Sequence, residues 1–272
     1  MKFLAHVPRP PLSAFVELFW LCEGYDPGHP RERLLPTGTT ELVFDLDDKP
    51  MLVAPRDGAP FESFRGPLVC GMHAEPFVID TSEPAAVLGI HFKPGGAFPF
   101  LPVPADETLG RHVPLEALWG PRSRALKEEV LNTPTAAGKF AVLERWLLAI
   151  AWRPLERHPA VGFALARFLG GTPVGGVGKV ADRAGLSRRR FIEAFRTEVG
   201  LTPKLFCRIQ RFQEVLAQIE GQRRVAWAAV AQACGYFDQA HFIHDFRAFS
   251  GLNPTEFLAV RGEHRNHIPL SA

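Results

Sequence analysis

The sequence predicts an α+β protein, in which a small β-barrel or β-sandwich is followed by a helical connector and an all-α double helix-turn-helix. One residue pattern occurs twice near the C-terminal end, short β-prone segments alternate with Pro and Gly in the first part, and apolar residues recur at helical spacing between them. We expect a β-rich effector or sensor domain at 1–114, a connector with candidate dimerisation helices at 115–158, the double helix-turn-helix at 159–262, and a tail at 263–272 that frays.

The repeated pattern combines two phenylalanines, an Arg, a Gly-Leu pair and a Pro, with matched positions 51 residues apart. Its copies are Phe191-x-x-x-Phe195-Arg196-x-x-x-Gly200-Leu201-x-Pro203 and Phe242-x-x-x-Phe246-Arg247-x-x-x-Gly251-Leu252-x-Pro254. In each copy, small apolar residues at helical spacing precede a Gly-containing turn, and a capping residue, Ser187 or Asp238, starts a second helix. This arrangement is typical of a helix-turn-helix, and its recurrence indicates a duplicated unit.

The outward face of each second helix carries the candidate DNA-binding residues, because these positions lie opposite the apolar ones at 100° per residue. Arg can bind guanine, Gln can bind adenine, and aliphatic groups contact the thymine methyl. The candidates for base contacts are Arg189, Arg190, Glu193, Gln239, Ile243 and His244. The candidates for phosphate contacts, which fix the register on DNA, are Arg188, Arg196, Lys204 and Arg247.

Residues 235–254, Gly-Tyr-Phe-Asp-Gln-Ala-His-Phe-Ile-His-Asp-Phe-Arg-Ala-Phe-Ser-Gly-Leu-Asn-Pro, resemble the signature of the AraC/XylS family of bacterial transcription regulators. The resemblance implies that the two helix-turn-helices are joined by a long helix, here 203–219, and bind successive major-groove segments on one face of double-stranded DNA. It also implies that RNA polymerase is a partner.

Two positions depart from the family pattern, because members often carry Arg where this chain has Glu193 and His244. Glu193 can accept a hydrogen bond from cytosine, or it can form an ion pair along the helix with Arg189 or Arg196. His244 can donate to a base, though less persistently than Arg at neutral pH. These departures leave the fold expectation intact and weaken the base-by-base assignment.

The first part of the chain contains several short predicted strands, which favour a small barrel or sandwich. Residues 12–22 are expected to begin as a helix and continue as a strand, and further strands are expected at 41–46, 51–54, 68–72, 77–80 and 87–92. Residues 35–44 and 89–97 resemble the cupin-like effector domains of the family, which implies a sensor but no particular ligand.

A barrel of this size can hold one small molecule. The candidate pocket residues are Phe44, Phe61, Phe64, Met72, Phe77 and Phe92, each of which could instead be an ordinary core residue. His73 and His91 invite a metal interpretation, but the sequence has no His-x-His pair there and no well-spaced carboxylate. We therefore expect neither a metal nor another cofactor.

Helices are also predicted at 123–131 and 135–152 in the connector and at 159–169 after it. The second helix has a broad apolar face that includes Phe140, Leu143, Leu147 and Leu148. This face must pack either within the chain or against a second copy in a homodimer, the arrangement that the family resemblance implies. The Gly-rich stretch at 170–178 lacks the spacing of a phosphate-binding loop and is predicted to be a flexible turn.

Composition fits a DNA-binding protein with two parts. The chain has 272 residues, of which 46% are apolar, and residues 160–262 hold 14 Lys/Arg against 8 Asp/Glu, whereas residues 1–159 hold 16 against 20. The four cysteines lack the C-x-x-C spacing of a zinc ribbon, and no apolar run is long enough for a membrane span. The sequence therefore predicts a cytoplasmic protein with no membrane contact.

Two further hypotheses compete with a metabolite-regulated DNA-binding protein. In one, the N-terminal part binds another protein and no metabolite. In the other, it transfers alkyl groups, as some family relatives do, which requires an activated Cys22 or Cys70. Neither cysteine has neighbouring thiols in the sequence, and we therefore do not expect an enzyme.

Overall fold

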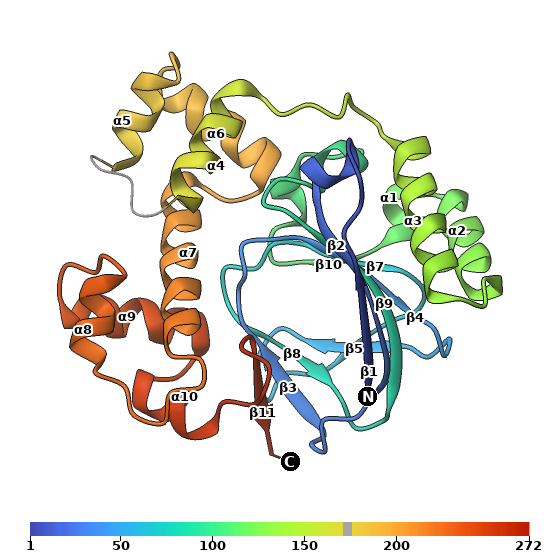
Figure 1. The fold of residues 1–272 in the computed structure, drawn as a ribbon, viewed down its shortest axis with the longest axis horizontal. Helices are drawn as coiled ribbons and strands as arrows, with labels where there is room; N and C mark the ends of the chain where they lie inside the picture. The colour runs from blue at the N-terminus through green and yellow to red at the C-terminus, as the bar shows by residue number, and fades with distance from the viewer. Residues whose placement is uncertain (171–175, 272) are drawn as a thin grey trace.

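The computed structural model describes residues 1–170 and 176–271. A β-rich N-terminal part and a helical C-terminal part lie side by side, and the three helices within residues 115–150, labelled α1 to α3, lie on the opposite side of the β-rich part (Figure 1). The predicted α+β architecture is confirmed. None of the described helices combines the length and the apolar character that crossing a bilayer requires.

The N-terminal part contains ten strands among the described residues: β1 (Lys2–His6), β2 (Val16–Tyr25), β3 (Arg31–Leu34), β4 (Glu41–Asp45), β5 (Met51–Ala54), β6 (Glu62–Phe64), β7 (Leu68–Cys70), β8 (Phe77–Asp80), β9 (Ala85–Phe92) and β10 (His112–Pro114). Three short 3-10 helices, η1 (Leu12–Ala14), η2 (Phe98–Phe100) and η3 (Ala105–Thr108), complete it. All the strand pairs are antiparallel. With a C-terminal strand, β11 (His267–Leu270), they form two sheets in the orders β1-β2-β9-β4-β7-β10 and β11-β3-β8-β5-β6.

Successive side chains of each strand point to opposite faces of the sheet, so one face can be apolar and buried. In β9, Leu88, Ile90 and Phe92 are buried in the core. Gly89 is opposite Trp20 in β2, and a methyl group at Gly89 would overlap the Trp20 indole, so the indole packs directly on the β9 backbone. The strands predicted from the sequence match β2, β4, β5, β7, β8 and β9, with residues 12–22 forming a 3-10 turn and then a strand.

The connector helices are α1 (Leu115–Trp119), α2 (Pro121–Asn132) and α3 (Ala136–Ile150). Most of the apolar face of α3 packs within the chain, because Phe140, Leu143 and Leu147 are buried in the core that the first sheet forms with η1. Leu148 is the predicted face residue that stays exposed, at 48%. The apolar face is therefore mostly accounted for without a second chain.

The helical part comprises α4 (Pro159–Leu169), α5 (Gly176–Arg183), α6 (Arg188–Val199), α7 (Pro203–Gln218), α8 (Trp227–Ala233), α9 (Gln239–Ser250) and α10 (Pro254–Val260). Helix α7 runs between the α4–α6 group and the α8–α10 group (Figure 1). The predicted flexible turn at 170–178 falls partly outside the described residues, at 171–175, and its last residues begin α5.

The prediction that the C-terminal tail frays is wrong. Residues His267–Leu270 form strand β11, which pairs with β3 and so adds an edge strand to the second sheet of the N-terminal part. Ile268 is buried, and the carboxylate of Glu32 in β3 accepts a hydrogen bond from Nδ1 of His267 at 2.7 Å. The tail is ordered because the backbone of β3 and the carboxylate of Glu32, both far away in the sequence, bind it.

Glu32 gives a pH-dependent contribution to stability. Burial of this carboxyl opposes ionisation, but hydrogen bonds from His267, Tyr25 and His29 outweigh it and lower the pKa of Glu32 to about 2, from 4.5. Its stabilising effect is therefore complete above about pH 4.5 and is lost as the pH falls towards 2. We expect the Glu32→Gln variant to be less stable than the wild type by roughly 2–3 kcal/mol at pH 6, a difference that shrinks between pH 4.5 and 3 in urea unfolding. A difference that stays constant over this range would show that the charge of Glu32 is not stabilising.

Candidate nucleic-acid interface and ligand pocket

Helix α6 is the second helix of the first helix-turn-helix. The hydroxyl of Ser187 accepts a hydrogen bond from the Arg190 N–H and caps its N-terminus, and Gly200 ends the helix in the left-handed region at φ 86°. Phe191, Phe195 and Val199 are buried against α4, α5 and α7. The opposite face therefore points to solvent.

Helix α9 repeats this construction in the second helix-turn-helix. The carboxylate of Asp238 accepts a hydrogen bond from the His241 N–H at 2.7 Å, and Gly251 ends the helix at φ 76°. Phe242, Phe246 and Phe249 are buried. The same caps and buried positions in both helices confirm the duplicated unit that the repeat predicted.

A buried carboxylate fixes α9 on the joining helix α7. Asp245 is 1% exposed and accepts two hydrogen bonds from Arg208, with Nη2 at 2.7 Å and Nε at 3.1 Å. The Arg211 guanidinium lies 3.8 Å from the other carboxylate oxygen. Both Arg208 nitrogens donate to the same oxygen, Oδ1, so this buried, charge-assisted pair ties α9 to α7.

The structure places the predicted DNA-binding residues at the surface. The exposed members are Arg188, Arg189, Arg190, Glu193, Arg196, Lys204, Gln239, Ile243, His244 and Arg247. Across the ion pairs of the described chain, none joins Glu193 to Arg189 or Arg196, so the intrahelical alternative for Glu193 is not observed. Phe237, which sequence reasoning did not single out, is 93% exposed in the turn before α9.

One predicted phosphate-binding residue already has an anionic partner. Nη2 of Arg196 donates to the Asp106 carboxylate in η3, at 2.9 Å. Asp106 belongs to the N-terminal part, so this ion pair links the two parts at the first recognition helix. It also places a carboxylate where a phosphate would have to compete for the same guanidinium.

Close packing accompanies this ion pair at the end of α6. Gly200 faces Met72 and the backbone of Ala105, and a methyl group at Gly200 would overlap the Met72 terminal carbon. Met72 and Ala105 are buried in the same cluster as the α6 and α7 phenylalanines. The first helix-turn-helix is therefore packed on the N-terminal part through a continuous apolar contact.

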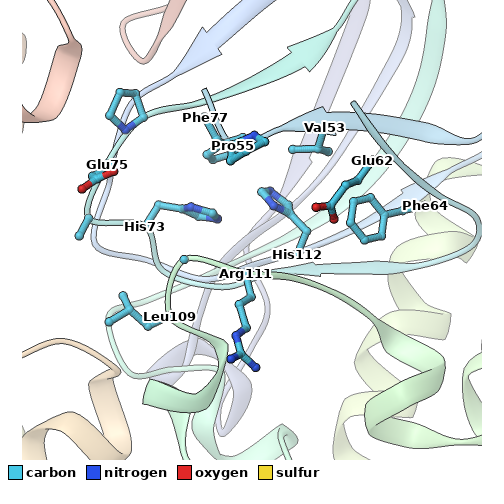
Figure 2. A pocket seen from close by; sticks show the side chains of 13 residues that line it. Val53, Pro55, Glu62, Phe64, His73, Glu75, Phe77, Leu109, Arg111 and His112 are labelled. Atoms are coloured by element: carbon cyan, nitrogen blue, oxygen red, sulfur yellow. The ribbon is translucent and has the colours of Figure 1, made fainter. Parts of the chain in front are cut away.

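A cavity of about 400 Å³ lies in the N-terminal part, close to this contact. Figure 2 shows its aromatic wall, in which the side chains of His73, Phe77 and His112 converge. The His73 ring centroid lies 4.4 Å from that of Phe77 and 4.7 Å from that of His112. The cavity is lined by Val53, Pro55, Glu62, Phe64, His73, Ala74, Glu75, Pro76, Phe77, Leu109, Gly110, Arg111 and His112.

The two histidines of the cavity are held neutral. Burial, and then the neighbouring His112, lowers the pKa of His73 to about 3, and burial lowers the pKa of His112 to about 4. Nε2 of each ring is buried without a hydrogen-bond partner in the described chain. Buried polar atoms of this kind normally have partners, so these two nitrogens mark a place where a ligand or water can bind.

Two of the six predicted pocket residues, Phe64 and Phe77, line this cavity. Phe44 and Phe92 belong to the core beneath the first sheet, Met72 packs towards Gly200, and Phe61 is half-buried outside the cavity lining. His73 was considered only as a metal ligand, and His112 was not considered. The residues next to His73 and His112 in the sequence do not indicate a cavity, because the two rings come together only in the folded chain.

Three further observations bear on the metal and alkyl-transfer alternatives, neither of which was expected from the sequence. Within the described residues, no three His, Cys, Asp or Glu side chains are grouped as metal ligands. Nδ1 of His91 lies 2.6 Å from the Glu41 carboxylate. Burial raises the pKa of the Cys22 and Cys70 thiols, which is the opposite of the activation that alkyl transfer requires.

Family models match both parts of the chain. Residues 180–259 match a helix-turn-helix domain family, and residues 4–114 match a domain family of unknown function, DUF6597. No curated protein matches the chain in sequence.

Solved structures with similar folds were also found. ToxT from Vibrio cholerae is similar over 95% of this chain and 98% of its own, with 9% identity and a TM-score of 0.49. ToxT bound to (E)-4-(8-methylnaphthalen-1-yl)but-3-enoic acid is similar over 95% and 99%, with 9% identity and a TM-score of 0.47. The xylose-binding transcription activator xylR is similar over 45% and 38%, with 21% identity and a TM-score of 0.31.

The Arg196–Asp106 ion pair predicts a gain of affinity on mutation. Asp106→Asn removes the competing charge, so we expect about two- to five-fold tighter binding to DNA, in line with 0.5–1 kcal/mol for an exposed pair. Fluorescence anisotropy with a labelled duplex measures this effect. The same substitution should have no effect in an Arg196→Ala background; an equal gain there would show that Asp106 acts on DNA without Arg196.

Proposed function

We propose that the chain is a transcription regulator of the AraC/XylS type that binds DNA through its double helix-turn-helix, with α6 and α9 entering successive major-groove segments on one face of the duplex. The observation that supports this geometry is the equivalence of the two helices. Each has a side-chain N-cap, a left-handed Gly at its end and a buried row of phenylalanines, and both pack on α7. Their reading faces are therefore held in a fixed relation by one rigid helix.

The exposed side chains divide by chemistry into base and phosphate contacts. Arg189 and Arg190 suit guanine, Gln239 suits adenine, Ile243 suits the thymine methyl, and His244 can donate to a base. Glu193 is free to accept from cytosine. Arg188, Lys204 and Arg247 provide positive charge for the phosphates, and Arg196 joins them when it leaves Asp106.

A small molecule regulates the protein from the cavity of the N-terminal part. The aromatic wall of Phe64, Phe77 and the two neutral histidines suits a small apolar or aromatic ligand with a hydrogen-bonding group. The unpaired Nε2 atoms of His73 and His112 supply the polar contacts that would orient it.

The cavity wall continues directly into the contact with α6. Gly110 lines the cavity and its N–H donates to the carbonyl oxygen of Met72 at 2.7 Å, while Met72 packs at Gly200. Leu109 lines the cavity immediately after η3, which carries Asp106. A ligand that shifts this short segment changes the support of the first recognition helix, provided that it binds the two arrangements with different affinity.

Two other partners follow from the family. RNA polymerase is the expected target of a regulator bound at a promoter, and a second copy of the chain is the expected partner if the operator contains two sites. The remaining exposed apolar side chains of the connector, among them Leu131, Leu148 and Trp152, are the surface available for such pairing.

Selection of binding sites from random DNA, with the full-length chain, tests the paired-groove arrangement. We expect two short enriched motifs about 34 Å apart, one turn of DNA. The Arg189→Ala variant should bind the selected site more weakly by roughly 1–3 kcal/mol and lose preference at one base pair. Lys204→Ala serves as the matched control, because loss of a phosphate contact weakens binding to all sequences alike.

Two results would contradict this assignment. A single enriched motif would mean that only one recognition helix reads DNA. Equal weakening of Arg189→Ala on all duplexes would mean that Arg189 contacts phosphate.

The cavity predicts that a small molecule is retained during purification. Native mass spectrometry of the full-length chain should show a bound compound, and Ala74→Trp, which fills the cavity from its wall, should remove it. Glu263→Gln, on the exposed C-terminal side, serves as the control variant. If the wild type carries no compound and instead captures a protein through the same surface, the N-terminal part is a protein-binding module.

A further inference from the structure

The C-terminal segment of the chain crosses from the second helix-turn-helix back to the N-terminal part, as Figure 1 shows for β11 beside β3. Four consecutive pairs join the two strands, from His267 opposite Leu34 to Leu270 opposite Arg31. A further backbone hydrogen bond, from the Leu35 N–H to the Asn266 carbonyl oxygen at 3.0 Å, extends the pairing. Strand β11 is the edge of its sheet, so β3 is its only strand neighbour among the described residues.

The Glu32 side chain of β3 forms a specific binding site, called the seat below, for this segment. Glu32 is 2% exposed and accepts hydrogen bonds from Tyr25 at 2.6 Å, from His29 at 3.0 Å and from His267 at 2.7 Å. Two of these donors belong to the N-terminal part, and the third comes from the tail. A buried carboxylate requires partners, so the seat is incomplete when the tail leaves it.

The docked segment is also attached to the DNA-binding helices. Nε2 of Gln213 in α7 donates to the Pro36 carbonyl oxygen at 2.7 Å and to Oδ1 of Asn266 at 2.9 Å. Nη1 of Arg33 in β3 donates to the carbonyl oxygen of Ser250, the last residue of α9, at 3.1 Å. Ile268 is buried in the same apolar cluster as Phe246 and Phe257 of the second helix-turn-helix.

The contacts that hold β11 on β3 can be replaced by contacts with water. The strand is four residues long and lies at a sheet edge, Ile268 is its only fully buried side chain, and most of its other contacts are hydrogen bonds that water can replace. The six residues between α10 and β11, 261–266, are the whole covalent connection. Undocking β11 therefore leaves the helices of the DNA-binding part intact.

We propose that the edge of β3 is a docking surface whose occupant is the chain's own C-terminal segment, and that this segment is a latch that holds the DNA-binding helices on the N-terminal part. The latched state binds DNA more weakly than the released state. Two observations indicate that docking weakens DNA binding. In the docked arrangement Asp106 forms an ion pair with Arg196, a candidate phosphate contact. Residues 1–159, with 16 Lys/Arg and 20 Asp/Glu, also place a net negative charge beside the DNA-binding part.

The latch is tested in the full-length chain by a matched pair of variants. Ile268→Asp places a charge in the buried seat of β11, whereas Val260→Asp makes the same change at a position 45% exposed in α10. Hydrogen exchange should show fast exchange at 262–271 in Ile268→Asp only. This variant should bind the selected DNA at least about five-fold more tightly than the wild type, the lower end of typical coupling between two sites, and Val260→Asp should not.

An engineered disulfide across the β3–β11 ladder tests the opposite direction. It is introduced by the double substitution Leu34→Cys and His267→Cys, at positions that face each other in the ladder. The oxidised form should bind DNA at least about five-fold more weakly than the same protein after reduction. This comparison within one variant does not depend on how well the substitutions are tolerated.

The inference rests on the proposed DNA-binding function, and the two can fail separately. If no form of the chain binds any DNA sequence, the proposed function fails, and exchange at 262–271 still decides whether the segment docks. If the wild type and variants bind DNA equally while exchange differs, the docked strand is structural and the latch is wrong. Fast exchange at 262–271 in the wild type would also overturn it.

Discussion

The packing of helix α7 is the constraint on which the rest of the molecule depends. Phe206 contacts the first helix-turn-helix, with its ring centroid 5.7 Å from that of Phe195, and Phe212 contacts the second, 5.3 Å from Phe246. Both α7 phenylalanines are fully buried, so the two recognition helices share one close-packed core. Their relative position is set by this core and by the Arg208–Asp245 ion pair.

The same core does not end at the boundary of the DNA-binding part. Leu35, Met72, Ala105 and Ile268, which come from loops and η3 of the N-terminal part and from β11, belong to the cluster built on α7. Interfaces between independent domains are usually more polar and leave the domains free to move. Here the apolar contact is continuous, so a change in the N-terminal part reaches the DNA-binding helices through packed side chains.

Features produced by contacts between residues close in the sequence could be predicted, whereas features produced by contacts between distant residues could not. The helix-turn-helix pair was predicted because caps such as Ser187 and Asp238 and the phenylalanine spacing act within one or two turns of helix. Strand β11 was missed because its partners, among them Glu32, lie more than two hundred residues away in the sequence. Only two of the predicted pocket residues line the cavity: Phe64 and Phe77 carry an aromatic signal, whereas the proximity of His73 and His112 arises only when β7 and β10 pair.

The N-terminal part contacts the DNA-binding part at the end of α6, along α7 and at the end of α9, and the packing of α7 connects these contacts. Met72 and Asp106 support the end of α6 beside the cavity, and Arg33 with β11 supports the end of α9. Because α6 and α9 both pack on α7, these contacts are connected through one helix. In the proposed regulation, a ligand in the cavity acts on the contact at the end of α6, and α7 connects that contact to the second helix-turn-helix. If the proposed ligand changes the affinity of the chain for DNA, then DNA must change the affinity of the cavity for that ligand by the same factor.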